Sequence, residues 1–305
     1  MTASSETPLQ SLRALIQQAA EQLLEVQGAE ELDEARLEVE LFYGRAANLD
    51  RVHVIAAGGD PADPAASKVF EQLLIRRLAH EPLAYILGQR EFYGLMFEVG
   101  PGALIPRPET ETLVEAALEA IRDHPQSRRL VRVADIGTGS GAVAIAVARH
   151  APSAKMFAID ASTAALPWAG KNLRKLGPLE RVVLLTGDLL DPIDEPLDII
   201  LANLPYVPTD EFNALPPEIR AHEPEVAVDG GDDGLELYRR FASQLRAHLV
   251  DVAYAVLVEI GAGQAPFAED FLLDGLGRPA NAEVRMHRDL RGIRRVVEVR
   301  VGLGN

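Results

Sequence analysis

The feature that most constrains the fold is an alternation of short apolar runs and helical segments after residue 107. The apolar runs have strand length and occupy residues 131–136, 155–159, 182–186, 197–202 and 252–260. Segments with helical spacing separate them, starting at 141 and spanning 162–176, 235–249 and 264–273. Such alternation is typical of a doubly wound, mainly parallel sheet. Two further runs, 283–287 and 293–301, are so close in sequence that we expect an antiparallel hairpin at one edge.

The first part of the chain has a different character. Residues 8–56 and about 65–80 carry apolar side chains at helical spacing, and residues 58–64 interrupt them with Gly and Pro. Residues 91–105 alternate aromatic and β-branched side chains with Gly and Pro, as in a short hairpin. We therefore expect a small helical domain over 1–88, a linking hairpin over 89–106 and the sheet domain over 107–305.

Composition excludes several classes of function. Affinity for nucleic acid depends on Lys and Arg, so a net charge of −16 disfavours a polynucleotide substrate and favours a protein or small-molecule partner. The chain has no cysteine, and we expect no disulfide, no thiolate metal site and no cysteine nucleophile. No apolar run approaches the ~20 residues of a membrane helix. The first ten residues lack the features of a signal peptide, so a cytoplasmic location is expected.

A glycine-rich turn follows the first strand of the expected sheet. Gly137, Gly139 and Gly141 let the backbone turn tightly and approach a ligand without a clash with Cβ. Open α/β sheets bind ligands at this edge. We therefore predict that Gly137, Thr138, Gly139, Ser140 and Gly141 bind a cofactor, although a ligand-free turn or a dinucleotide site would show the same spacing.

Two acidic residues at the ends of later strands support the prediction of a cofactor site. Asp160 ends the second strand, where its carboxylate can accept both hydroxyls of a ribose. Asp188 follows the third strand and is placed to accept an adenine amino group, with Leu189 against the ring. Each aspartate alone could cap a turn or helix. Compatible groups at successive strand ends favour a cofactor with an adenosine moiety, and the second acid favours a methyltransferase.

The segment Asn203-Leu204-Pro205-Tyr206 ends the fourth strand. A planar amide or base nitrogen is a poor nucleophile until acceptors hold its N–H bonds and a platform fixes its plane. The side chain of Asn203 and the carbonyl of Leu204 can supply the acceptors, Pro205 stiffens the turn and Tyr206 can stack on the plane. Catalysis would then rest on positioning and preorganised dipoles, without a strong base. An Asn-Pro turn with only a structural role is the alternative.

Nearly the whole chain resembles the HemK/PrmC group, the glutamine methyltransferases that modify peptide chain release factors. The segments that carry the resemblance are residues 81–88, 91–94, 104–111, 135–141, 203–206, 223–224, 230–238, 259–261 and 289–292. The resemblance implies a class I S-adenosylmethionine-dependent methyltransferase fold with a seven-stranded sheet. It also implies S-adenosylmethionine at residues 137–141, Asp160, Leu189 and Asn203, and a glutamine side chain at residues 203–206. The helical domain would help to grip the release factor.

One departure leaves alternatives open. The family usually has Asn-Pro-Pro-Tyr, whereas Leu204 replaces the first proline here. Asn-Leu-Pro-Tyr is similar to the reacting motif of rRNA adenine dimethylases, but those enzymes carry their extra helical domain after the sheet, and the acidic charge suits RNA poorly. A methyltransferase acting on a glutamine of a ribosomal protein, or a protein-binding module without activity, remains as a further alternative.

Overall fold

The computed structural model describes residues 10–27 and 32–304, which fall into two compact units, 1–88 and 89–305. The sequence predicts no signal peptide over residues 1–10. Residues 1–9 of this stretch lie outside the described range. The same holds for residues 8–9 and 28–31 of the expected helical stretch. No helix within the described residues is long and apolar enough to cross a bilayer.

The first unit is helical. Its elements are α1 (Leu12–Gln27), α2 (Leu32–Ala47), α3 (Arg51–Ala56), η1 (Ala57–Gly59), α4 (Pro64–Leu78) and α5 (Leu83–Leu87). The apolar stripes of these helices meet in one core that includes Phe42 and Phe70. At the Gly- and Pro-rich break, the Asp63 carboxylate accepts the Ala66 N–H at 2.7 Å and so caps α4, with Pro64 in its first turn.

The second unit begins with a two-stranded antiparallel hairpin, β1 (Gln89–Phe92) and β2 (Leu95–Glu98). Asn172 of α8 (Leu166–Leu176) anchors it: the side-chain oxygen accepts the Glu98 N–H at 2.7 Å, and the side-chain nitrogen donates to the Glu98 carbonyl at 2.9 Å. Residues 89–98 of the expected linking hairpin therefore pack as part of the second unit.

The second unit is built on a seven-stranded sheet with the order β5-β4-β3-β6-β7-β9-β8. Its strands are β3 (Val131–Ile136), β4 (Ala154–Asp160), β5 (Val182–Thr186), β6 (Ile199–Ala202), β7 (Tyr254–Glu259), β8 (Glu283–Arg288) and β9 (Arg294–Val301). The first five are parallel, whereas β9 is antiparallel to both β7 and β8. The doubly wound, mainly parallel sheet with an antiparallel edge hairpin is thus confirmed.

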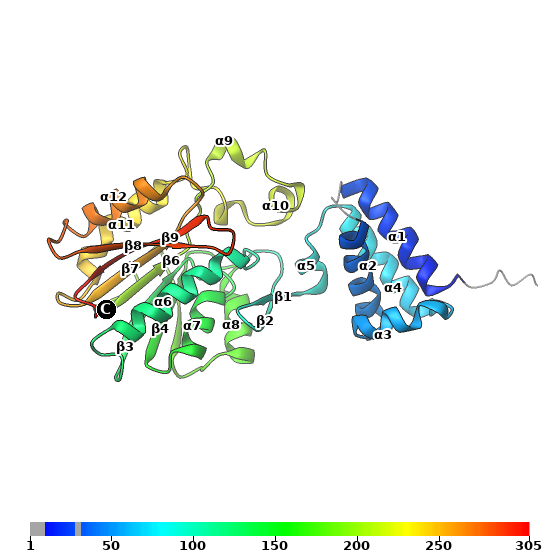
Figure 1. The fold of residues 1–305 in the computed structure, drawn as a ribbon, viewed down its shortest axis with the longest axis horizontal. Coiled ribbons are helices and arrows are strands. Elements are labelled where there is room, and N and C mark those ends of the chain that lie inside the picture. Colours follow the sequence, from blue (N-terminus) through cyan, green and yellow to red (C-terminus); the bar gives the residue numbers. More distant parts are fainter. Residues whose placement is uncertain (1–9, 28–31, 305) are drawn as a thin grey trace, which may run out of the picture. The chain divides into compact units, whose positions relative to one another are not determined.

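Helices cover both faces of the sheet (Figure 1). On one face lie α6 (Glu111–Asp123), α7 (Ala142–His150) and α8; on the other lie α11 (Glu236–His248) and α12 (Ala265–Gly275). Strands β6 and β7 are consequently buried along their whole length. Four short helical elements lie in loops: η2 (Pro108–Thr110), α9 (Thr209–Phe212), α10 (Pro217–His222) and η3 (Glu225–Ala227).

The strand order defines where a ligand can bind. Strands β4 and β5 lie on one side of β3, and β6 and β7 lie on the other, so the winding direction reverses between β3 and β6. Open α/β sheets bind ligands at the carboxyl ends of the strands at such a switch point. Gly137 follows β3 and Asn203 follows β6, so this position brings the two predicted motifs together.

Candidate active site

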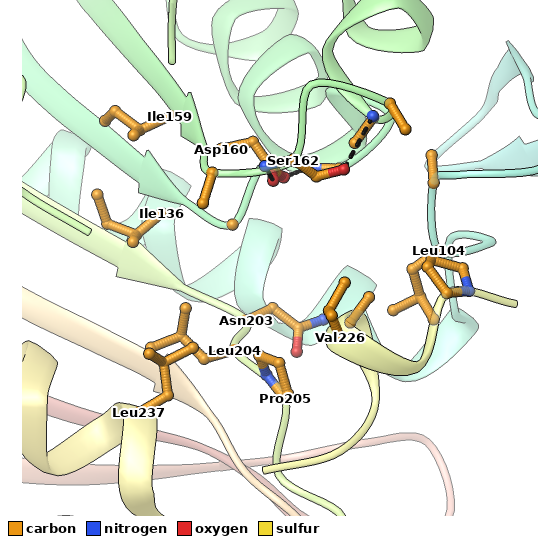
Figure 2. A pocket seen from close by; sticks show the side chains of 18 of the residues that line it. Leu104, Ile136, Ile159, Asp160, Ser162, Asn203, Leu204, Pro205, Val226 and Leu237 are labelled. Atoms are coloured by element: carbon orange, nitrogen blue, oxygen red, sulfur yellow. Dashed lines mark hydrogen bonds between the residues drawn. The ribbon is translucent and has the colours of Figure 1, made fainter. Parts of the chain in front are cut away.

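A cavity of about 430 Å³ lies at this switch point (Figure 2). Of the residues predicted to bind the cofactor, those that line it are Gly137, Gly139, Asp160, Asp188, Leu189 and Asn203. Its lining also includes Leu104 from the segment before α6, Leu237 from α11 and Val226, whose side chain is 75% exposed. The cavity therefore draws on loops after four strands, on the segments before α6 and α11, and on α11 itself.

The three glycines of the turn have different local reasons for lacking a side chain. All have positive φ: 74° at Gly137, 56° at Gly139 and 81° at Gly141. A Cβ at Gly137 would lie 3.2 Å from the carbonyl oxygen of Asn203, and one at Gly141 would lie 3.1 Å from Ile145. A Cβ at Gly139 would meet nothing closer than 4.0 Å. Gly139 is thus the position of the turn where the backbone faces open cavity space.

Thr138, Ser140 and Gly141, also predicted to bind cofactor, are not among the lining residues. Thr138 and Ser140 are buried, and the Thr138 hydroxyl donates to the carboxylate of Asp135 at 2.6 Å. The same carboxylate oxygen accepts the Ala144 N–H at 3.1 Å, and burial raises the pKa of Asp135 to about 6. These contacts fasten the turn to α7, so the Thr138 side chain supports the turn from behind, and the backbone carbonyl of Ser140 accepts the Asn172 side-chain N–H at 2.9 Å.

Asp160 holds the glycine turn from the neighbouring strand. Its Oδ2 accepts the Gly139 N–H at 2.7 Å, and its Oδ1 accepts the Ser162 N–H at 2.8 Å. Burial raises the pKa of this carboxyl, while the two backbone donors oppose that shift. Each carboxylate oxygen has two acceptor sites, so both oxygens can still accept a hydroxyl from a ligand in the cavity.

Asp188 and Leu189 follow β5 in the cavity wall. The Asp188 side chain is 48% exposed and pairs with Arg240 of α11. This ion pair was not predicted, and it engages the carboxylate that we assigned to an adenine amino group. Leu189 is buried with a φ of 50°, a left-handed conformation that is uncommon for a side chain of this size.

A second, smaller cavity of about 200 Å³ adjoins the first. Asn203, Leu204 and Pro205 line both cavities, and Tyr206 lines the smaller one together with Arg107 and Glu259. Figure 2 shows Asn203 beside Pro205 below the larger cavity, opposite Asp160. A methyl donor in one cavity and a side chain in the other would meet at Asn203.

Hydrogen bonds fix the backbone of this segment. The Tyr238 hydroxyl of α11 lies 3.1 Å from the Leu204 carbonyl oxygen and also contacts the carbonyl of Glu259. Gln264 donates its side-chain N–H to the Tyr206 carbonyl at 2.9 Å. The Tyr206 ring is partly buried, and burial with the nearby charge of Glu259 raises its pKa to about 12. Tyr206 therefore remains a neutral ring at physiological pH.

Four side chains that organise the site were not assigned roles from the sequence: Thr110, Glu223, Tyr238 and Glu259. Thr110 Oγ1 accepts the Asn203 side-chain N–H at 3.1 Å, and the Thr110 hydroxyl lowers the pKa of the nearby Glu259 carboxyl by stabilising its charged form. Burial raises the pKa of Glu259 to about 7. Glu259 ends an apolar strand, as Asp160 and Asn203 do, and this position is the signal that could have identified it.

Comparisons with known proteins identify relatives of both units. Residues 14–88 match the PrmC N-terminal domain family, and residues 113–222 match the methyltransferase small domain family. A release factor glutamine methyltransferase of Geobacter sulfurreducens is 39% identical over 272 residues, which cover 89% of this chain and 91% of that protein. One of Moorella thermoacetica is 42% identical, with coverage of 83% and 87%.

A solved structure of a release factor-specific protein-(glutamine-N5) methyltransferase from Alicyclobacillus acidocaldarius is 30% identical to this chain. The match has a TM-score of 0.41 and covers 67% of this chain and 99% of that one.

Proposed function

Because this chain belongs to the release factor glutamine methyltransferase family, we propose that it methylates the glutamine of the Gly-Gly-Gln loop of a peptide chain release factor. The methyl group goes from S-adenosylmethionine to the side-chain amide nitrogen. The observation that carries the proposal is the meeting of the two cavities at Asn203, Leu204 and Pro205. One cavity has the groups for an adenosine-bearing cofactor, and the other offers acceptors for an amide.

The larger cavity offers groups that suit the chemistry of S-adenosylmethionine. Gly139 leaves room for close approach, and the Asp160 carboxylate retains acceptor sites for ribose hydroxyls. The wall at Leu189 and Leu237 is apolar, as an adenine ring requires. The Asp188 carboxylate can accept the adenine amino group if its ion pair with Arg240 breaks, or if the carboxylate contacts both groups at once. Bound there, S-adenosylmethionine supplies an electrophilic methyl group on a positively charged sulfur.

The smaller cavity would take the glutamine side chain. The amide nitrogen needs two acceptors, and we assign them to the side-chain oxygen of Asn203 and the carbonyl oxygen of Leu204. Tyr238 holds that carbonyl in place, since its hydroxyl lies 3.1 Å away. The ring of Tyr206 stacks on the amide plane, and Pro205 keeps the turn rigid. The nitrogen becomes acidic as it accepts the methyl group and then releases a proton to solvent, so positioning provides most of the catalysis.

The replacement of the usual proline by Leu204 is compatible with this mechanism. The position acts through its backbone carbonyl, which leucine and proline share. The Leu204 side chain is 3% exposed and packs into the core beneath the site. We therefore assign Leu204 no side-chain contact with the reacting nitrogen.

We further propose that the helical unit over residues 1–88 grips the release factor. Residues 14–88 of this unit match the PrmC N-terminal domain family, which supports this role. A net charge of −16 supports a protein substrate over a nucleic acid. We also propose that this enzyme works in the cytoplasm together with its proposed substrate.

The direct test is methylation with labelled S-adenosylmethionine and a matched panel of release factors, ribosomal proteins and rRNA. Mass spectrometry then locates the labelled atom. We expect label on the glutamine of a release factor, and a variant of that factor with the glutamine changed to Glu serves as the control. Label on a ribosomal protein or on adenine with none on a release factor would overturn the proposal.

A further inference from the structure

Glu259 is a buried acid that the mechanism above does not use. It lies at the end of β7, it is 1% exposed and it lines the smaller cavity. Its Oε2 has no hydrogen-bond partner within the described residues 10–27 and 32–304. A buried carboxylate with an unpartnered oxygen is costly, and a protein keeps such a group only where the surrounding structure supports it.

The same carboxyl determines the direction of the hydrogen bonds at Thr110. A threonine hydroxyl has one proton to donate and can also accept. The Thr110 hydroxyl lowers the pKa of Glu259, and because a carboxylate only accepts, we assign the Thr110 proton to that carboxylate. Thr110 Oγ1 must then accept from its other partner, the side chain of Asn203 at 3.1 Å.

This direction matters because the two ends of an asparagine amide are nearly isosteric but chemically opposite. With the Asn203 nitrogen bound to Thr110, the amide oxygen is left for the reacting site, and Figure 2 shows that oxygen on the side of Pro205. The reverse orientation would direct N–H donors at the N–H bonds of the substrate amide. The substrate nitrogen would lose one hydrogen-bond acceptor, and its N–H groups would face the N–H groups of Asn203, which repel them.

We propose that Glu259, acting through the Thr110 hydroxyl, is a positioning residue that holds the Asn203 side-chain oxygen toward the substrate nitrogen. The inference rests on the proposed function only in identifying the nitrogen; the orientation of Asn203 follows from the hydrogen bonds themselves. Neither Glu259 nor Thr110 needs to contact the substrate for this role.

Several charged and titratable groups set the protonation of Glu259. Arg107 and Glu109 face it from the segment before α6, and Arg295 faces it from β9; Tyr206 and Tyr238 lie nearby. Burial raises the pKa of Glu259 to about 7, against the opposing effects of Thr110 and the two arginines. Below that pH the carboxyl loses the charge that makes it the preferred acceptor, and it can offer a proton to Thr110 instead. Methyl transfer should therefore fall as pH drops through about 7.

The kinetic test compares Thr110→Val, Thr110→Ser and Glu259→Gln with the wild-type chain. Thr110→Val keeps the shape but removes the hydroxyl, and we expect kcat to fall about tenfold or more, whereas Thr110→Ser should restore it to within about threefold. In Glu259→Gln the acidic limb of the pH profile near pH 7 should disappear. The affinity for S-adenosylmethionine should change less than about twofold in all three variants, because neither Thr110 nor Glu259 lines the cofactor cavity. Normal turnover by Thr110→Val, or an unchanged acidic limb in Glu259→Gln, would overturn the proposal.

A second measurement does not depend on the substrate. In protein labelled with ¹⁵N at asparagine, the side-chain N–H₂ resonances of Asn203 are identified by their loss in Asn203→Ala. We expect the chemical shifts of these resonances to change near pH 7, as Glu259 titrates, in the wild-type chain and in Thr110→Ser. In Thr110→Val the same chemical shifts should not depend on pH. If they titrate equally in all three, the hydroxyl does not link the two residues. A chain that shows the expected titration but methylates no release factor would contradict the proposed function and leave the positioning role intact.

Discussion

The Glu223 carboxylate accepts the backbone N–H of Ile105 at 3.0 Å, although 118 residues separate them along the chain. Its other oxygen pairs with Arg107 at 2.5 Å, and the Glu223 side chain is only 1% exposed. The neighbours of these residues, Leu104 and Pro224, line the larger cavity. The ion pair therefore closes one rim of the site by joining the segment before α6 to the loop after α10.

Breaking this contact should destabilise the second unit. Glu223→Ala leaves the Ile105 N–H without its acceptor and removes a buried partner of Arg107, so we expect a loss of about 2 to 3 kcal/mol in the free energy of unfolding. Urea denaturation measures it. Glu225→Ala is the matched control, because Glu225 lies two residues away and is exposed. Equal midpoints for the two variants would show that the ion pair does not support the fold.

Asn203→Ala should separate catalysis from cofactor binding. The variant loses an acceptor on the reacting nitrogen, which should cost about 2 to 4 kcal/mol of transition-state stabilisation. Affinity for S-adenosylmethionine, measured by calorimetry, should fall far less. Leu204→Pro is the control, since it keeps the backbone carbonyl and should retain activity within about tenfold. Normal turnover by Asn203→Ala would refute the proposed amide clamp.

Gly139→Ala should weaken cofactor binding, because the added methyl group would occupy space that the cofactor needs. The new Cβ has no protein atom nearer than 4.0 Å, but it points into the space that a ligand would need. The positive φ adds a strain of roughly 1 to 2 kcal/mol. Gly277→Ala carries comparable strain, with a φ of 75° and nothing within 4 Å, at the end of α12. Calorimetric titration should show weaker binding in Gly139→Ala only; equal affinities would place the cofactor away from the turn.

Asp135 should make the fold less stable as pH rises. Burial raises the pKa of its carboxyl from 3.8 to about 6, so between these values the native state binds more protons than the unfolded state. Its contribution to the free energy of unfolding is therefore full below pH 4 and falls until about pH 6, by about 3 kcal/mol. Denaturation of Asp135→Asn at several pH values measures this, because the neutral amide cannot ionise. The stability of the variant relative to wild type should rise from pH 4 to 6 and then level off; a flat difference would contradict the raised pKa.

Removing residues 1–88 should affect a protein substrate more than a peptide. If the helical unit grips the release factor, remote binding energy positions the glutamine, and its loss lowers kcat/KM for the intact factor. A short peptide spanning the Gly-Gly-Gln loop should be methylated at nearly the original rate. Binding of S-adenosylmethionine by residues 89–305 is the control for folding. An unchanged ratio of the two specificity constants would show that the helical unit does not recognise the substrate.

Local pattern was sufficient for most of the architecture. Strands β3 to β7 follow from short apolar runs, which the inner strands need because both of their faces are buried, and the edge hairpin of β8 and β9 follows from the short distance between two strand-like segments. The glycine turn, Asp160 and Asn203 could be placed together because the carboxyl ends of parallel strands share one edge of the sheet. The loop helices α9, α10 and η3 were not predicted, since segments of a few residues carry too little periodicity to identify them.

Local sequence pattern thus predicts which groups lie at the ligand-binding edge, whereas contacts between distant segments set how those groups are held. Thr138 and Ser140 belong to the predicted motif, yet both are buried, and the Thr138 hydroxyl supports the loop through Asp135. Asn203 takes its direction from Thr110, 93 residues earlier in the chain. Such pairings depend on how helices dock on the sheet, and no local periodicity encodes that docking. For this reason the positions of the reacting groups could be read along the chain, whereas their orientations emerged only from the packed fold.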